Sequence, residues 1–345
     1  METEVAVPAH PALAEKTHRQ LMQMRICDLG VTLDASGLDR YIKQLYDELD
    51  RRDIPFHPPC YLTDEWGCPD GVPVIGIPFY LADPVLVALE RETMLGAEGD
   101  DPAEMMKLLR HECGHAVNYA YHVHKRREWE RLFGPFDSPY PEHYRTRRFS
   151  KRYVRHLEGS YAQRHPDEDF AETFAVWLSP VGDWRKRYKG WGAYDKLVFV
   201  DQAMHAIAGR VPQNGKSERD RPVESILQTL EEYYAAKRAK SKADFPDAYD
   251  EQLRGVFSRK RVPGAVAAAA WLRLRRHEMI DRVTRWTGER RYVVDQLYAH
   301  VTARARTLRL WIRPIDQSEI AADLSAFLAS LVMNYFYSGS FLTEP

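Results

Sequence analysis

The sequence predicts an α+β fold that is predominantly helical. Its 345 residues are 44% hydrophobic and 29% charged, which is the composition of an ordinary globular protein and is long enough for two domains. Most of the chain has helical periodicity. Residues 72–81 differ, because they combine Val, Ile, Gly and Pro and form the best candidate strand. We therefore expect one small sheet among many helices.

Export and membrane insertion are not expected. The first 11 residues contain no Lys or Arg, whereas a secretory signal begins with basic residues. The longest uncharged stretch, residues 324–343, is interrupted by Ser, Asn and Gly and is expected to be a core helix. The four cysteines are too irregularly spaced for a disulfide framework or a paired zinc ribbon; they are Cys27, Cys60, Cys68 and Cys113. We expect a cytoplasmic protein without a membrane partner.

Two domains are expected, joined by one linker. The first covers residues 1–210, and the linker covers residues 211–222, which are polar, rich in turn formers and without periodicity. Residues 223–345 are expected to form a helical C-terminal region. The expected helices there cover residues 223–243, 266–286 and 292–311, with a last helix after Pro314.

The first domain contains two helices with clear starts. Asp101 is a good cap, Pro102 suits the first helical position and Glu104 completes a capping pattern, so a helix is predicted over about residues 102–121. Pro166 begins a second helix, predicted over about residues 166–179.

The first of these helices contains an HExxH motif. His111 and His115 are four residues apart, so they lie on one face of the helix and can share one zinc ion. Glu112 lies beside that face and suits a base that takes a proton from metal-activated water. Two histidines on an ordinary helix are the alternative, so the motif requires a third ligand.

A third zinc ligand is expected on the C-terminal side of the HExxH motif. The metzincin pattern would need Gly and His where the chain has Asn118 and Tyr121, which excludes that class. Glu168 and Glu172 lie four apart on the second helix. One of them can bind zinc while the other holds the free nitrogen of a ligating histidine, although a solvated helix face would also carry such acids.

The motifs together resemble a known family. Residues 111–115, the Leu-Phe-Gly of residues 132–134 and residues 160–175 resemble the bacterial zinc-binding metallopeptidases. The likeness to the catalytic domain of anthrax lethal factor and to the Mlc titration factor peptidases is more distant. The resemblance covers about residues 105–180 and implies a zincin-like, gluzincin-type metallopeptidase domain with a small sheet.

The resemblance also implies residue roles. The ligands of one Zn²⁺ per chain would be His111, His115 and Glu168. Glu172 would hold the free ring nitrogen of a ligating histidine. Glu112 would be the general base, and Tyr161 would donate a hydrogen bond to the oxyanion. The expected activity is hydrolysis of a peptide bond in a peptide or protein substrate by metal-activated water.

Two alternatives stay open. Residues 254–313 contain 15 Lys or Arg and four acids, a local charge of 15 − 4 = +11 in a chain of net charge −1. Such a basic segment with interspersed aromatic residues could bind nucleic acid in a zinc-containing regulator, although solvent-facing arginines on packed helices are the favoured interpretation. A zinc hydrolase acting on a non-peptide amide would use the same ligands. The sequence leaves the oligomeric state open.

Overall fold

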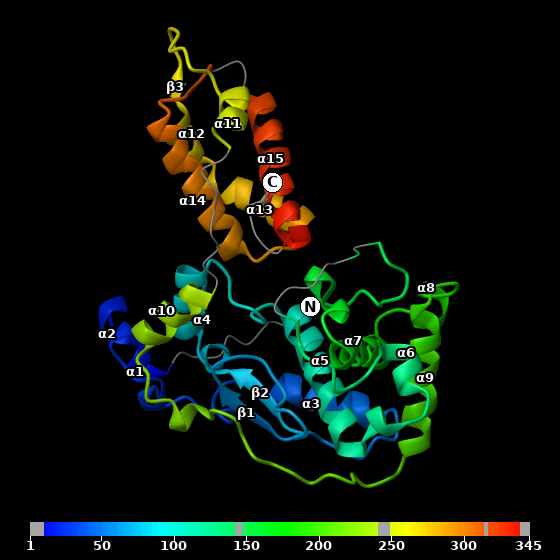
Figure 1. Cartoon of the computed structure of the whole chain (residues 1–345). Helices are drawn as coiled ribbons and strands as arrows, with labels where there is room; N and C mark the ends of the chain where they lie inside the picture. Colours follow the sequence, from blue (N-terminus) through cyan, green and yellow to red (C-terminus); the bar gives the residue numbers. More distant parts are fainter. Residues whose placement is uncertain (1–9, 142–146, 148, 241–248, 314–316, 339–345) are drawn as a thin grey trace. The chain divides into compact units, whose positions relative to one another are not determined.

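A computed structural model gives the structure of the chain (Figure 1). The described residues are 10–141, 147, 149–240, 249–313 and 317–338. They form two compact units that divide between Ala236 and Lys237, here called unit 1 and unit 2. Helices dominate and each sheet has two strands, so the predicted α+β, mostly helical class is confirmed.

Unit 1 contains the predicted motifs. Its α-helices are α1 (Pro11–Ala14), α2 (His18–Met22), α3 (Asp39–Asp50), α4 (Pro84–Met94), α5 (Pro102–Tyr121), α6 (Trp129–Phe133), α7 (Pro166–Leu178), α8 (Trp184–Arg187), α9 (Ala193–Ile207) and α10 (Leu230–Lys240), which crosses the division. Short 3₁₀ helices are η1 (Ile26–Asp28), η2 (Phe79–Ala82), η3 (Val123–Lys125), η4 (Glu158–Gln163) and η5 (Val223–Ser225).

The sheet of unit 1 is a parallel pair. β1 (Cys60–Thr63) pairs with β2 (Ile75–Pro78), which is buried at every residue. The strand is shorter than the predicted residues 72–81. It ends at Pro78, which has no N–H to donate to a ladder, and the chain then turns into η2.

The start of α5 depends on three local features. Asp101 accepts hydrogen bonds from the backbone amides of Ala103 and Glu104, 2.9 and 3.1 Å away. Pro102 fits the first turn because its missing N–H would have no partner there. The helix therefore begins at the residue that the sequence indicates.

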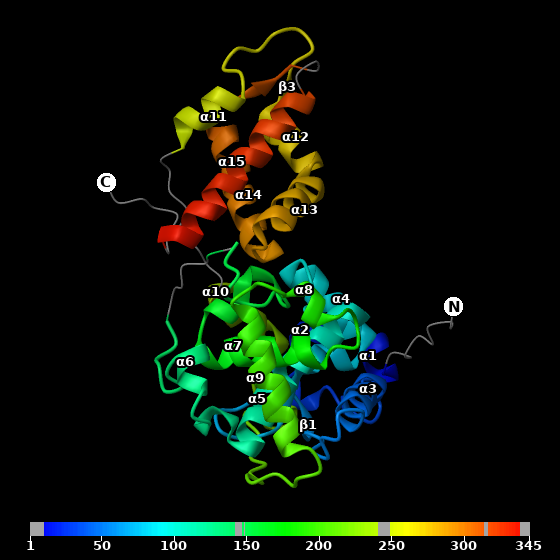
Figure 2. The ribbon, with the colours of Figure 1, turned by 90° about the vertical axis from the view of Figure 1, so that its right-hand side faces the viewer.

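α7 lies between α5 and α9 (Figures 1 and 2). His165 caps it by accepting a hydrogen bond from the backbone of Asp167, and Pro166 fills its first position. On the other side, the buried carboxylate of Asp169 forms an ion pair with Lys196 of α9. These contacts fix the rotation of α7 and therefore the direction of its side chains.

The predicted linker lies along unit 1. The backbone amides of Gln213 and Asn214 donate to the carbonyl of Ala120, 2.9 and 3.1 Å away, and so cap the C-terminus of α5. Further on, the Tyr61 hydroxyl hydrogen-bonds the backbone of Asp220. Residues 211–222 thus do not separate the two units, and the division falls inside α10 instead. The sequence could not distinguish these two cases, because a polar segment rich in turn formers lacks helical periodicity both when it connects two domains and when it lies on the surface of one.

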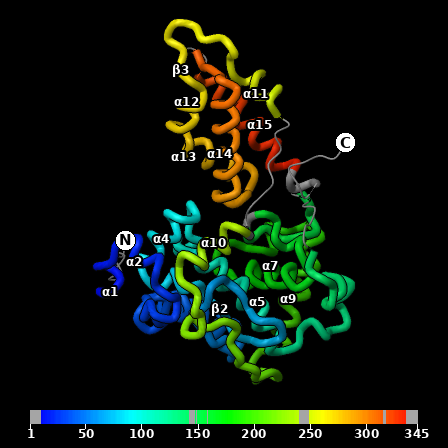
Figure 3. Tube along the Cα trace, turned by 60° about the vertical axis from the view of Figure 1, so that its left-hand side comes forward, coloured from blue at the N-terminus to red at the C-terminus, as the bar shows by residue number. Residues whose placement is uncertain are grey.

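Unit 2 is a helical cluster (Figure 3). Its described residues also include an antiparallel pair of two-residue strands. Its elements are α11 (Asp250–Val256), β3 (Val266–Ala267), α12 (Ala268–Leu274), α13 (Arg276–Thr287), α14 (Arg291–Thr307), β4 (Trp311–Ile312) and α15 (Gln317–Ser338). Buried side chains of its helices share one core, which includes Leu253, Leu272, Ile280, Leu297 and Leu324.

The helices of this region differ in detail from those expected. The helix predicted over residues 266–286 is divided at Arg275, and α14 ends before Trp311, which lies in β4. The helix predicted over residues 223–243 begins only at Leu230. The helix expected after Pro314 is α15, and residues 314–316 before it lie outside the described residues.

Within the described part of the chain, no helix is both long and apolar enough to cross a membrane.

Candidate metal centre

Three predicted ligands meet between α5 and α7. His111 and His115 lie one helical turn apart on α5, and Glu168 lies in the first turn of α7. All three side chains are buried, and one ligand atom of each lies within 4.8 Å of the others. Among the described residues, no other group of three His, Cys, Asp or Glu has this spacing.

The three atoms form a nearly equilateral triangle. His111 Nε2 lies 3.1 Å from Glu168 Oε2, and His115 Nε2 lies 3.2 Å from the same oxygen. The two Nε2 atoms are 3.2 Å apart. Ligands at about 2.0–2.1 Å from a tetrahedral zinc ion are separated by about 3.3 Å. The spacing therefore fits three corners of a zinc tetrahedron.

The outer ring nitrogens are held by carboxylates. His111 Nδ1 lies 3.0 Å from Glu172 Oε1, and His115 Nδ1 lies 2.8 Å from Asp167 Oδ2. A carboxylate only accepts, so each Nδ1 donates and the neutral imidazole presents its Nε2 as an acceptor. Two nitrogen lone pairs and the Glu168 oxygen then converge on one point. A cation satisfies all three, and this donor set suits Zn²⁺.

Asp167 is a site residue that the sequence did not reveal. Besides His115, its carboxylate accepts hydrogen bonds from Asn118 Nδ2 at 2.8 Å and the Tyr119 hydroxyl at 2.6 Å. Asp167 precedes Glu168 and points to a different part of α5, as expected for neighbours 100° apart on a helix. The available signal was the polar pair Asn118 and Tyr119, one turn after His115.

Electrostatics favour positive charge at the centre. Burial alone lowers the pKa of His111, but hydrogen bonds to Glu168 and Glu172 outweigh it and raise that pKa to about 9. Burial alone raises the pKa of Glu168, but its hydrogen bonds to His111 and His115 hold that pKa well below the ordinary value. The surrounding carboxylates therefore stabilise either protons or a metal cation.

Glu112 differs from the other acids of the site. It is buried, and burial raises its pKa, against the opposing attraction of His111 and His115. No described residue donates a hydrogen bond to its carboxylate. A buried carboxylate that receives no hydrogen bond from the described residues, beside two histidines, can exchange a proton with a small molecule.

Tyr161 lies in η4, with its ring 5.5 Å from that of His111 between centroids. Its hydroxyl accepts a hydrogen bond from Arg164 Nη1 at 3.1 Å. An arginine only donates, so the Tyr161 hydroxyl is itself a donor, and it hydrogen-bonds the carboxylate of Glu168. Burial and the neighbouring carboxylate of Glu168 raise its pKa, which keeps the hydroxyl protonated.

A second tyrosine beside the site was not predicted. The ring of Tyr140 stacks on His165, with centroids 3.9 Å apart and planes 11° apart. Burial raises the pKa of Tyr140, and so does its hydroxyl contact with Glu168. The residue as a whole is 49% exposed. No sequence signal marks it, because it lies in an irregular segment far from the motifs.

An HExxH helix packed against a second helix that provides a carboxylate is the arrangement of zinc-binding peptidases. Comparison with known families agrees with this class. Residues 74–193 match the family described as "Putative zinc-binding metallo-peptidase". The predicted resemblance is thus confirmed for this part of the chain, which includes the HExxH helix and Glu168. No curated protein and no solved structure matches the chain.

Proposed function

We propose that the chain is a zinc-dependent metallopeptidase that hydrolyses a peptide bond. The observation that carries this proposal is the triangle of His111 Nε2, His115 Nε2 and Glu168 Oε2, with each histidine oriented by a carboxylate. Three protein ligands leave one tetrahedral position for water or substrate, which is characteristic of catalytic rather than structural zinc sites.

Zinc bound by these residues would supply a Lewis acid that polarises the substrate carbonyl and acidifies water. Glu112 takes the proton of the attacking water and passes it to the leaving amine. Its raised pKa and the absence of a hydrogen-bond donor to it among the described residues support this role, because both make its carboxylate a better proton acceptor than an exposed glutamate. Asp167 and Glu172 keep the two imidazoles in the tautomer that binds metal.

Tyr161 stabilises the oxyanion that develops on the scissile carbonyl. Arg164 orients its hydroxyl, and the raised pKa keeps the proton available. A preorganised donor in a buried site is more effective than water, because it needs no reorientation during the reaction.

A peptide is proposed as the partner in preference to nucleic acid. Six arginines of the basic segment 254–313 form ion pairs with carboxylates of unit 2: Arg254, Arg275, Arg276, Arg282, Arg291 and Arg304. These pairs reduce the charge left for a phosphate backbone. The cytoplasm remains the proposed compartment, since all four cysteines are free thiols.

A peptide library tests the function. The zinc-loaded chain should generate new amino termini, detected by mass spectrometry, and the Glu112→Gln variant should not. Glu130→Gln, an equivalent change on the exposed face of α6, is the control and should keep activity. Cleavage of small acyl amides without cleavage of any peptide would favour the non-peptide alternative. Equal cleavage by Glu112→Gln would contradict the mechanism.

A further inference from the structure

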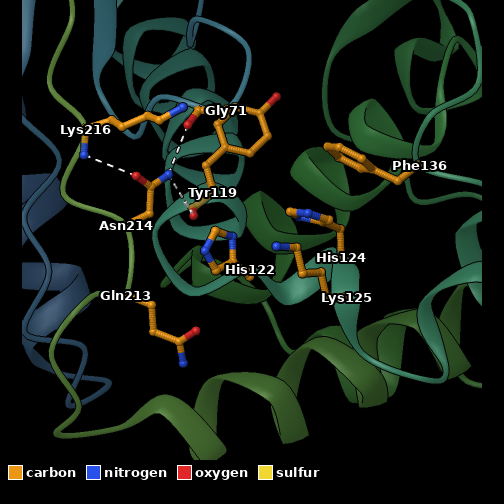
Figure 4. A pocket seen from close by; sticks show the side chains of 9 residues that line it. All are labelled: Gly71, Tyr119, His122, His124, Lys125, Phe136, Gln213, Asn214 and Lys216. Atoms are coloured by element: carbon orange, nitrogen blue, oxygen red, sulfur yellow. Dashed lines mark hydrogen bonds between the residues drawn. The ribbon is translucent and has the colours of Figure 1, made fainter.

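Beyond the metal centre, a cavity of about 360 Å³ opens beside the C-terminus of α5 (Figure 4). Four basic side chains line it: His122, His124, Lys125 and Lys216. Figure 4 shows Lys216 on one side, His124 and Lys125 on the other, and His122 between them. No acidic side chain is among the lining residues.

The two lysines are available to a ligand. Lys125 and Lys216 are exposed, and neither has a carboxylate partner within the described part of the chain. Burial lowers the pKa of His122 and of His124, and Lys125 contributes to both shifts. The histidines are therefore hydrogen-bonding groups, while the lysines provide the positive charge.

The backbone fixes the positions of these groups. His122 ends α5 in the left-handed conformation, with φ of 49°. Asn214 Nδ2 donates to the carbonyls of Gly71 and Tyr119, at 3.0 and 3.3 Å, and so anchors the segment that carries Lys216. The cavity is thus built by residues that are already held in place without a ligand.

The cavity is joined to the metal centre through Tyr119. The ring of Tyr119 lines the cavity, while its hydroxyl donates to Asp167, which holds His115. The ring centroids of Tyr119 and His115 are 6.2 Å apart. Tyr119 thus contributes both to the wall of the cavity and to the support of His115.

One wall of the cavity is apolar. Phe136 stacks on His124, with centroids 4.1 Å apart and planes 16° apart, and its ring lies edge-on to Tyr119 at 6.4 Å. A cationic opening beside an aromatic wall suits an anionic group attached to an organic chain better than a fully hydrated ion.

We propose that this cavity is a subsite for a carboxylate of the peptide substrate, either its C-terminus or an Asp or Glu side chain. Lys125 and Lys216 pair with the carboxylate, and His122 lies within the same wall to hydrogen-bond it. The inference rests on the proposed peptidase function and adds a preference among substrates. Neither the proposed zinc ligands nor Glu112 would by themselves select peptides that carry a carboxylate at this position.

The test uses the zinc-loaded Glu112→Gln protein, which should bind peptides without cleaving them. Three peptides share one neutral sequence: one has a free C-terminal carboxylate, one has a C-terminal amide, and one has the amide and an internal Glu. Calorimetry should show about 3- to 30-fold tighter binding for at least one carboxylate peptide than for the neutral amide, as two exposed ion pairs allow. The difference should shrink at high salt.

Adding Lys125→Gln and Lys216→Gln should remove this preference. Lys186→Gln and Lys189→Gln, which also remove two exposed charges from unit 1, should preserve it. Whichever carboxylate peptide gains affinity identifies the group that the cavity takes. Equal affinity for all three peptides, or equal loss in both double variants, would overturn the proposal.

Inorganic phosphate separates this inference from the peptidase proposal. Phosphate should perturb the NMR signals of His122 and His124 in the zinc-loaded protein, and less so after the Lys125 and Lys216 changes. If this occurs while none of the three peptides binds, the cavity is an anion site that takes no peptide carboxylate, and the subsite proposal fails. The peptidase proposal fails only if the peptide library is not cleaved. If peptides are cleaved without a carboxylate preference, the subsite proposal fails alone.

Discussion

Gly114, inside the HExxH motif, lies directly against Ala171 of α7. A Cβ atom at position 114 would be 2.7 Å from Ala171 Cα and 3.0 Å from its carbonyl oxygen. The two helices therefore approach closely at the level of the metal centre. This approach brings Glu168 to the histidines, and it is possible because glycine has no side chain.

Gly114→Ala should therefore damage both the fold and the metal site. The clash is with backbone, so relief requires separation of α5 and α7, and we expect a loss of about 1–3 kcal/mol in the free energy of unfolding. Zinc affinity should fall as well. Denaturant unfolding and chelator competition measure the two effects.

The matched control is Gly255→Ala in α11. A Cβ there meets nothing within 4 Å, and alanine favours a helix. That variant should be neutral or stabilising. If Gly114→Ala behaved the same way, the close approach of α5 and α7 would not be needed for the site.

The roles of three acidic residues can be separated by metal affinity. The wild-type chain should hold one zinc ion, as measured by elemental analysis after dialysis. Glu168→Ala should abolish tight binding, because it removes a proposed zinc ligand. Asp167→Ala and Glu172→Ala should weaken binding by about 10- to 100-fold, because they remove only the partner of an imidazole. Glu172→Ala with the stronger effect would mean that Glu172 is the ligand.

Glu112→Gln should lower kcat by about 10²- to 10⁴-fold on any peptide that the library identifies, since it removes the proposed general base. Zinc content and thermal stability should stay near those of the wild type, because no described residue depends on the Glu112 carboxylate for a hydrogen bond. Loss of the metal in this variant would instead indicate that Glu112 contributes to binding.

A double-mutant cycle should show that the buried ion pair between Arg110 and Glu48 stabilises the fold. Arg110 Nε and Nη2 each donate to the Glu48 carboxylate at 2.7 Å, joining α5 to α3. Arg110→Met or Glu48→Gln alone should destabilise the chain by about 3–5 kcal/mol, because the remaining polar partner stays buried. The double variant should lose less than the sum. Additive losses would show that the two side chains act independently.

The sequence determined the elements whose signals are local. The cap at Asp101 with Pro102, and Pro166 for α7, gave the starts of both helices because the groups concerned are neighbours in the chain. The four-residue spacing of His111 and His115 likewise predicted a shared helix face. The family resemblance then supplied roles for Glu168, Glu172 and Tyr161, and the structure places all three beside His111.

Tertiary structure decided what depends on packing between distant segments. Asp167 and Tyr140 reach the site only because α7 has one particular rotation and an irregular segment lies beside it. The segment 211–222 was expected to be a linker but caps α5, since a polar sequence is the same whether it covers a domain or joins two. Local capping fixes where a helix begins. Only the contacts made on folding fix which of its side chains meet another helix.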